Sequence, residues 1–341
     1  MKKLIATFVV FMMATQWVSA QTKDILWLRG SKTMISGEVS KVSPDSVSIK
    51  SSGKTRDIGV EQIDRINFGD DPSGLQTVRA SVKNGQLEQA KAQLGTVKSE
   101  GRPFVKQEIA FFKAAIDAKL ALRGEGSVND AARLVGGFLK SSPGSFRYFE
   151  ACETMGDLAM SLGKFDSAVK YYERLAKSKS SGIAAEGSLL LGDAWLLKGD
   201  PKKAEAMFQR CTTTKDPRLK AIGQLGVASS RAKAGDSSDQ TIAMIEKVIE
   251  EYDSSDVELF ARAYNALGEA YLAAGKTESA LDAYLHTDLL FYRDTGKHAE
   301  ALFHLAKLWA EVNKPSEASR AKKTLTQRYP NSVWALSLIH I

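Results

Sequence analysis

Metal or acid–base chemistry would depend first on the four histidines of the sequence, His286, His298, His304 and His340. None of them has the spacing of a His-Glu-x-x-His metal motif, and His298 and His304, six residues apart, fall off a common helix face. The sequence contains neither a glycine-rich phosphate loop nor a Gly-x-Ser-x-Gly nucleophile elbow. We therefore expect no enzymatic activity, no cofactor and no metal site, with the histidines on the surface or in a groove.

The two cysteines, Cys152 and Cys211, are the other reactive candidates. The helical pattern described below places them early on one helix and late on another, in elements that are not direct neighbours. A disulfide requires α carbons about 4.4–6.8 Å apart, so we expect no bridge between them. Both are expected to be small buried hydrophobic residues.

The composition of the 341-residue chain is that of a folded protein, with 43% hydrophobic and 26% charged residues. It excludes a wholly disordered chain, a collagen-like chain and a disulfide-dense scaffold. The net charge is +7, but residues 21–72 are neutral overall and the rest of the excess is spread along the chain. No basic stripe suited to nucleic acid is present, so nucleic-acid partners are not expected.

The N-terminal residues 1–20 have the pattern of a secretory signal peptide. Lys2 and Lys3 precede an apolar run over 4–13, and the small residues Ser19 and Ala20 follow it. The alternative is a membrane anchor, but this run is about ten residues long and a spanning helix needs about 20. We expect cleavage after Ala20, no later membrane span, and a periplasmic or secreted protein.

Residues 21–72 predict a small all-β module of five short strands separated by Gly-, Pro- and Ser-containing turns. The expected strands cover 24–28, 34–42, 46–50, 55–60 and 64–68. Their length and rhythm resemble SH3-like or Sm-like mini-barrels. We expect a closed or partly closed antiparallel barrel that serves as a structural or docking module.

Residues 73–332 repeat a helical pattern. Similar segments begin at Met155, Leu191, Leu225, Leu267 and Leu305, at separations of 36, 34, 42 and 38 residues. The pattern resembles the tetratricopeptide repeat, a helical hairpin with a period of 34 residues. The resemblance implies a mainly α protein, an α-solenoid of about seven hairpins preceded by the β module. Residues 333–341 are expected to be an incomplete or truncated C-terminal helix.

Small residues recur at two positions in each repeat, where a larger side chain would keep the two helices of a hairpin apart. The expected packing positions are Gly156, Gly192, Gly226, Gly268 and Ala306 on first helices and Ala168, Ala204, Ala280 and Ala318 on second helices. Tyr172, Phe208 and Tyr284 are expected to fill the space between neighbouring hairpins.

The first helices of such an array form a concave face that usually binds peptides or partner helices. The residues expected to line it are Glu150, Glu153, Asp157, Met160, Glu186, Leu189, Asp193, Leu196, Asn265, Glu269, Leu272, Phe303 and Lys307. Acidic residues follow the glycine at Asp157, Asp193 and Glu269, so the groove is expected to favour neutral or basic segments. Alternatively, these acids only keep the groove soluble.

The ending Arg-Tyr-Pro-Asn-Ser over 328–332 and the Leu-Gly-Asp/Glu helices are similar to Tol-Pal coordinator proteins and to the repeat lipoproteins of outer-membrane assembly. That resemblance implies a non-catalytic scaffold of the bacterial cell envelope whose partners are other envelope proteins or peptides. The alternative function is binding of carbohydrate or peptidoglycan through the β module, for which Trp27 is the one suitable aromatic residue.

Overall fold

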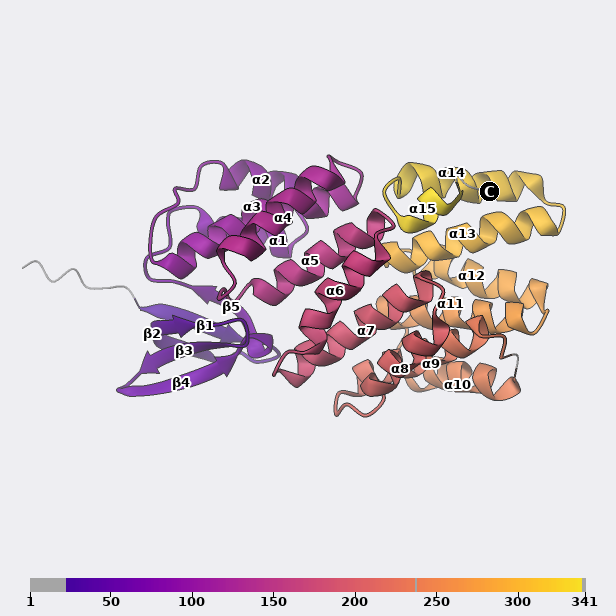
Figure 1. Ribbon diagram of the computed structural model, residues 1–341, viewed down its shortest axis with the longest axis horizontal. Helices are drawn as coiled ribbons and strands as arrows, with labels where there is room; N and C mark the ends of the chain where they lie inside the picture. Colours follow the sequence, from indigo (N-terminus) through magenta and orange to yellow (C-terminus); the bar gives the residue numbers. More distant parts are fainter. Residues whose placement is uncertain (1–22, 237, 339–341) are drawn as a thin grey trace, which may run out of the picture.

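The structure, a computed structural model, describes residues 23–236 and 238–338, so the expected signal peptide lies outside the described residues. A β-sheet lies at one end of an elongated molecule, and the helices extend away from it as a series of hairpins (Figure 1). The expected mainly α architecture, with a short β region followed by a helical solenoid, is confirmed.

The sheet has five antiparallel strands in the order β4-β3-β2-β1-β5, and a 3₁₀ turn (Val60–Gln62) joins β4 to β5. The strands are β1 (Asp24–Leu28), β2 (Met34–Val42), β3 (Ser46–Ser51), β4 (Lys54–Gly59) and β5 (Ile63–Asn67). All five lie within two residues of the expected ranges. The expected barrel is wrong in its closed form, because β4 and β5 are the two edges of an open sheet in the part of the chain that is described.

Fifteen helices follow within the described residues. They are α1 (Leu75–Lys83), α2 (Leu87–Leu94), α3 (Pro103–Leu122), α4 (Val128–Ser141), α5 (Tyr148–Ser161), α6 (Phe165–Ala176), α7 (Ser181–Leu197), α8 (Pro201–Cys211), α9 (Pro217–Lys233), α10 (Asp239–Glu251), α11 (Val257–Ala273), α12 (Thr277–Leu290), α13 (Thr295–Glu311), α14 (Pro315–Arg328) and α15 (Val333–Leu338). They pair in sequence into seven hairpins, with α15 packed on α13 and α14.

Helix boundaries follow local chemistry. The Asp200 side chain accepts a hydrogen bond from the Lys203 amide, and Pro201 occupies the first turn of α8, where no amide hydrogen is needed. Ser332, which follows the last proline of the chain, likewise accepts from the amide of Ala335 at 3.1 Å and begins α15. These caps separate consecutive helices with turns of a few residues, which makes neighbouring helices antiparallel.

In the hairpins α5–α6, α7–α8 and α11–α12, an aromatic ring of the second helix lies directly on a glycine of the first. A β carbon at Gly156 would collide with the Tyr172 ring, and one at Gly192 or at Gly226 would collide with the Phe208 ring. At Gly268, such a carbon would lie 2.6 Å from the Tyr284 ring. The glycines therefore make room for the aromatic rings. Phe208 bridges two hairpins, and so does Tyr284, whose ring also stacks on His304 of α13.

The other packing positions are also largely buried. Ala168, Ala204 and Ala280 have no exposed surface, Ala306 is 7% exposed, and Ala318 on α14 is half-buried. The array is thus tightest in its central hairpins and looser at α14.

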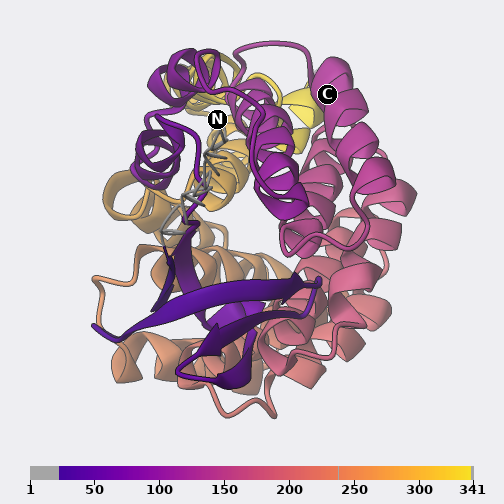
Figure 2. The same cartoon turned by 90° about the vertical axis from the view of Figure 1, so that its left-hand side faces the viewer.

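The first helices of successive hairpins pack on one another, from α3 through α5, α7, α9, α11 and α13. Viewed from the sheet end, the hairpins wind around a common axis, and the C-terminal helices return beside the purple N-terminal ones (Figure 2). The side-chain amide of Asn331 donates to the Ala121 carbonyl oxygen at 2.8 Å, which joins the C-terminal turn to the end of α3. The superhelix therefore contacts itself after one turn.

The sheet shares its core with the helices. A continuous buried cluster joins Leu26 and Ile49 of the sheet to Phe111 of α3 and Leu158 of α5. Beside it, the fully buried Glu108 carboxylate pairs with Arg79 at 2.5 Å and with Arg147 at 2.5 Å. The sheet and the first hairpins thus form one packed unit, and the sheet covers one end of the superhelix.

Candidate functional site

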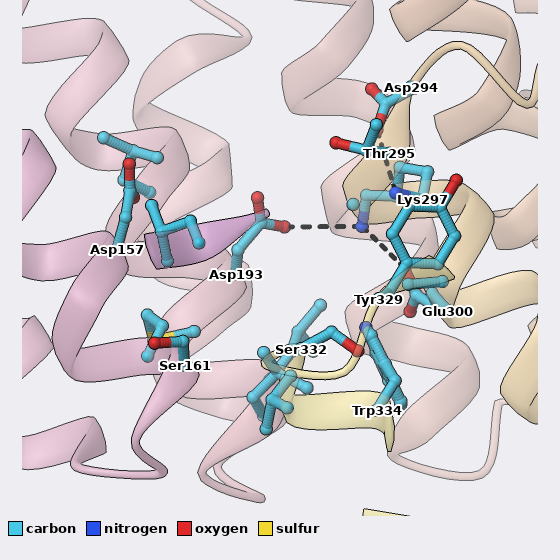
Figure 3. A pocket seen from close by; sticks show the side chains of 18 of the residues that line it. Asp157, Ser161, Asp193, Asp294, Thr295, Lys297, Glu300, Tyr329, Ser332 and Trp334 are labelled. Atoms are coloured by element: carbon cyan, nitrogen blue, oxygen red, sulfur yellow. Dashed lines mark hydrogen bonds and ion pairs between the residues drawn. The ribbon is translucent and has the colours of Figure 1, made fainter. Parts of the chain in front are cut away.

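Two adjoining cavities occupy the inner surface of the superhelix. The proximal cavity, of about 660 Å³, lies between the sheet and helices α5, α7, α9 and α11. The distal cavity, of about 330 Å³, lies between α5 and α7 on one side and α13 and the C-terminal turn on the other (Figure 3). Leu190 and Arg262 line both cavities, so the two adjoin one another, and we refer to them together as the channel.

Most of the expected groove residues line this channel. Glu150, Glu153, Glu186 and Leu189 lie in the proximal cavity, and Asp157, Met160, Asp193 and Leu196 lie in the distal cavity. The remaining ones lie farther along the array: Asn265 and Glu269 are buried beside α13, Leu272 is partly buried, Phe303 packs against Trp334, and the Lys307 ammonium lies over the Phe303 ring.

One side of the channel is an acidic wall formed by Glu153, Asp157 and Glu186 on α5 and α7. None of the three forms an ion pair within residues 23–236 and 238–338. Burial, together with the negative charges of Asp157 and Glu186, holds the pKa of Glu153 well above its usual range. Burial also raises the pKa of Asp157 to about 6, although its carboxylate accepts a hydrogen bond from the Tyr172 hydroxyl at 2.7 Å.

The opposite side is an ion-paired wall. Its residues are Lys233 on α9, Arg262 and Glu269 on α11, Lys297 and Glu300 on α13, and Asp193 on α7. Arg262 pairs with Asp193 at 3.0 Å, and Lys297 lies 2.9 Å from Glu300 and 3.9 Å from Asp193. Lys233 pairs with Glu269 at 2.7 Å. Figure 3 shows the Lys297 ammonium between Asp193 and Glu300, across the distal cavity from Asp157. Charges on this wall are therefore neutralised within the protein.

The other cations of the proximal cavity are also engaged. Arg218 pairs with Asp256 and Glu258, Arg147 with Glu108 and Glu150, and the Arg29 guanidinium donates to the Ile63 carbonyl oxygen at 3.0 Å. Among the described residues, the acidic wall is thus a part of the channel without ion pairs, and the charges of Lys119 and Arg29 offset only part of the burial and repulsion that raise the pKa of its carboxyl groups.

Sequence reasoning found the acids but missed the basic side chains of the channel. Arg262, Asn265 and Glu269 follow one another at i, i+3 and i+7, as do Lys297, Glu300 and His304. The residues of each set share one face of a helix. Asn265 and Glu269 are predicted to line the groove from their position on such a face, and Arg262 could have been predicted in the same way. The pairing of these faces with Asp193 involves residues far apart in the chain, and no local pattern indicates it.

Two of the histidines are more buried than expected. His298 is 2% exposed and hydrogen-bonds to the Tyr329 hydroxyl at 2.7 Å and to Asp288 at 2.7 Å, so the expectation of a surface or groove residue is wrong for it. His304 is half-buried and stacks on the Tyr284 ring at 4.6 Å, and burial lowers its pKa to about 3. Both cysteines are buried free thiols, on α5 and at the end of α8.

Trp27 lies on β1 with the guanidinium of Arg65 over its ring, 4.1 Å from the centroid. That face of the ring is not free to stack on a sugar. No helix among the described residues is long and apolar enough to cross a membrane.

Residues 154–217 match the family model of the tetratricopeptide repeat. Among solved structures, the fold is similar to a tetratricopeptide repeat protein from Parabacteroides merdae, with a TM-score of 0.55 and 16% identity over 78% of this chain and 96% of that one. It is also similar to a Rap protein complexed with competence and sporulation factor, with a TM-score of 0.54 and 12% identity over 76% of each chain. No curated protein sequence gives a match. The hairpins, their glycine–aromatic packing and these likenesses agree: residues 154–217 match the tetratricopeptide repeat, and the helical part of the chain has a tetratricopeptide-type fold.

Proposed function

We propose that this protein is a scaffold that binds an extended segment of a partner protein inside the channel, with a basic side chain of that segment against the acidic wall. Tetratricopeptide arrays generally act in protein–protein interaction and are generally non-catalytic. The observation that supports the finer proposal is that Glu153, Asp157 and Glu186 form no ion pair among the described residues and that their pKa values are raised in the channel.

A partner cation would relieve a cost that the free protein carries. The raised pKa of Asp157 and Glu153 means that their charged forms are disfavoured where they stand. A lysine or arginine side chain placed between them would replace part of the lost hydration and screen their mutual repulsion. An acidic side chain there would add to that repulsion, so charge selects the segment.

Apolar side chains beside the acids supply the rest of the contact. Met160, Leu189, Leu190 and Leu196 line the same channel. Burial of aliphatic surface contributes about 25 cal/mol per Å² to association before the entropic costs of binding. A segment with alternating basic and apolar side chains would match both features.

The site of action in this proposal is the bacterial cell envelope. It is supported by the expected signal peptide over 1–20, which lies outside the described residues, and by the resemblance of the repeats and of the 328–332 ending to envelope proteins. The partner is accordingly an envelope protein or peptide.

The test uses the mature full chain with a photo-crosslinking residue at Leu190, between the two cavities. Cross-linked envelope proteins are identified by mass spectrometry in the wild type and in Glu153→Gln/Asp157→Asn/Glu186→Gln. A matched control neutralises three exposed acids on other helices, Asp239→Asn/Glu250→Gln/Glu278→Gln. We expect the cross-linked partner to be lost in the first variant and kept in the second. Equal capture by both would contradict a role for the acidic wall.

A further inference from the structure

A cluster of three potential metal ligands includes two carboxylates of the ion-paired wall. Glu269 on α11 and Glu300 and His304 on α13 place one ligand atom each within 4.8 Å of one another. Both carboxylates belong to buried residues, and the imidazole is half-buried. Glu300 and His304 are one helical turn apart and share a face of α13, and α11 packs directly on that face. Two packed helices thus hold the three groups in place.

Residues in and beside the cluster carry unpartnered polar atoms. The Tyr284 hydroxyl, the Asn265 side-chain oxygen and His304 Nε2 are buried atoms without a hydrogen-bond partner in the described part of the chain. Tyr284 has no exposed surface and Asn265 is 3% exposed. Leaving such an atom unsatisfied costs about 1–3 kcal/mol, so three together point to a ligand.

Geometry directs these atoms toward the carboxylates. The ring carbon that bears the Tyr284 hydroxyl lies on Gly268, the residue before Glu269, and the ring stacks on His304 at 4.6 Å with the planes 3° apart. The Asn265 amide nitrogen lies 3.3 Å from a Glu300 carboxylate oxygen, which places the Asn265 side-chain oxygen beside the cluster.

We propose that Glu269, Glu300 and His304 form a binding site for a divalent transition-metal ion of the zinc class, a role that goes beyond the proposed partner binding. Two carboxylate oxygens and one imidazole nitrogen suit such an ion, whereas calcium and magnesium prefer oxygen ligands alone. The Asn265 amide nitrogen donates to Glu300 at 3.3 Å and so orients one ligand, and the Tyr284 hydroxyl, which has no partner among the described residues, is free to donate a second such hydrogen bond.

Two lysines compete with the metal ion in this proposal. Lys233 pairs with Glu269 and Lys297 with Glu300, and both lysines also line the distal cavity. Their side chains are 28% and 21% exposed, so the ammonium groups have room to turn into the channel when a metal ion takes the carboxylates. Metal binding would then add positive charge to the channel surface.

The test titrates the untagged full chain, treated with chelator, with zinc chloride against a chromophoric zinc indicator. We expect one saturable site, and binding about tenfold or more weaker in His304→Gln, which removes a ligand without changing charge. The matched control is His286→Gln, because His286 also stacks on a tyrosine ring of a neighbouring helix but lies outside the cluster. Affinity in the control should equal that of the wild type.

A second variant separates a metal site from a purely structural ion-pair network. Lys233→Met removes a competitor for Glu269, so zinc binding should tighten severalfold, and it should do so even if His304→Gln fails to fold. Absence of a saturable site, unchanged affinity in His304→Gln, or no tightening in Lys233→Met would overturn the proposal and leave the cluster as an ion-pair network.

Discussion

The two walls of the channel begin from the same position of the repeat and end in opposite electrostatic states. Asp157, Asp193 and Glu269 each follow the small residue of a first helix. Asp193 and Glu269 pair with cations supplied by other helices, at 3.0 and 2.7 Å, whereas Asp157 has no ion pair among the described residues and accepts a hydrogen bond from the Tyr172 hydroxyl. The repeat pattern sets where an acid stands, and the neighbouring helices decide whether its charge is compensated.

This difference bears on function because a charge that is paired internally contributes little to the recognition of a partner. The ion pairs of one wall join neighbouring helices, whereas in the proposed function the acidic wall selects the ligand. The predictions below challenge this division, beginning with the packing that the two walls have in common.

The largest effect on stability is expected from the packing of a glycine against a tyrosine ring, a feature that both walls share. Gly156→Ala and Gly268→Ala each force a methyl group into a tyrosine ring, and we expect each to lower the free energy of unfolding by about 3 kcal/mol. Urea denaturation measures both. Gly137→Ala on α4 is the control, because open space surrounds that position and alanine should be neutral or stabilising. Clearly unequal losses would mean that the walls differ in packing as well as in charge.

A smaller loss of stability is expected from breaking an ion pair of the ion-paired wall. Arg262→Met leaves Asp193 without its main partner, and we expect a loss of about 2 kcal/mol in unfolding free energy. Adding Asp193→Asn to Arg262→Met should restore most of it, because no uncompensated carboxylate then remains. Arg320→Met, at an exposed position of α14, should change stability little. A double variant as unstable as Arg262→Met alone would show that the pair is not the cause.

On the acidic wall, we expect a substitution to raise the free energy of unfolding instead of lowering it. The pKa of Asp157 is raised in the folded protein, so its contribution favours folding below pH 4 and is lost as the pH rises through about 6. Asp157→Asn removes this loss, and its side-chain oxygen can still accept a hydrogen bond from the Tyr172 hydroxyl. We therefore expect its free energy of unfolding at pH 7 to be about 1 kcal/mol higher than that of the wild type. Denaturation from pH 4 to pH 7 should show a flatter profile than that of the wild type. A destabilised variant at pH 7 would contradict the uncompensated state of Asp157.

The smallest effect concerns binding. Because Asp157 ionises near pH 6, the affinity for a lysine-containing apolar peptide should rise about fivefold between pH 5 and pH 7.5, an energy near 1 kcal/mol. Fluorescence anisotropy measures this, and the same peptide with glutamate in place of lysine is the control. The variant Glu153→Gln/Asp157→Asn/Glu186→Gln should bind with little dependence on pH. If that variant kept the pH dependence, the titrating group would be a residue outside the acidic wall.

Local pattern predicted much of this fold. Strand alternation located all five strands, and the spacing of Gly156, Gly192, Gly226 and Gly268 located the hairpins. Both signals arise within one element or between adjacent ones. Closure of the sheet could not be predicted, because it depends on whether β4 meets β5, and strand alternation is the same in an open and a closed sheet.

The candidate site shows the same division. Residues on one helix face, such as Asp157 and Asp193, could be placed in the channel from spacing alone. The pairing of Asp193 with Arg262, 69 residues away, depends on the superhelical path of the whole array. Likewise, the spacing of the histidines does not indicate that His304 is a potential metal ligand. Glu269 lies beside it only because α11 packs on α13.

The contact of Asn331 with Ala121 has a consequence for the architecture as a whole. In an open array, stability is close to a sum over nearest-neighbour repeats, and hairpins can be added or removed at little cost. Here a hydrogen bond spans 210 residues, and Pro330 packs so closely on Gly124 that a β carbon there would lie 2.8 Å away. Deleting or inserting a hairpin would separate these surfaces, so the repeat number is set by the circumference of one turn.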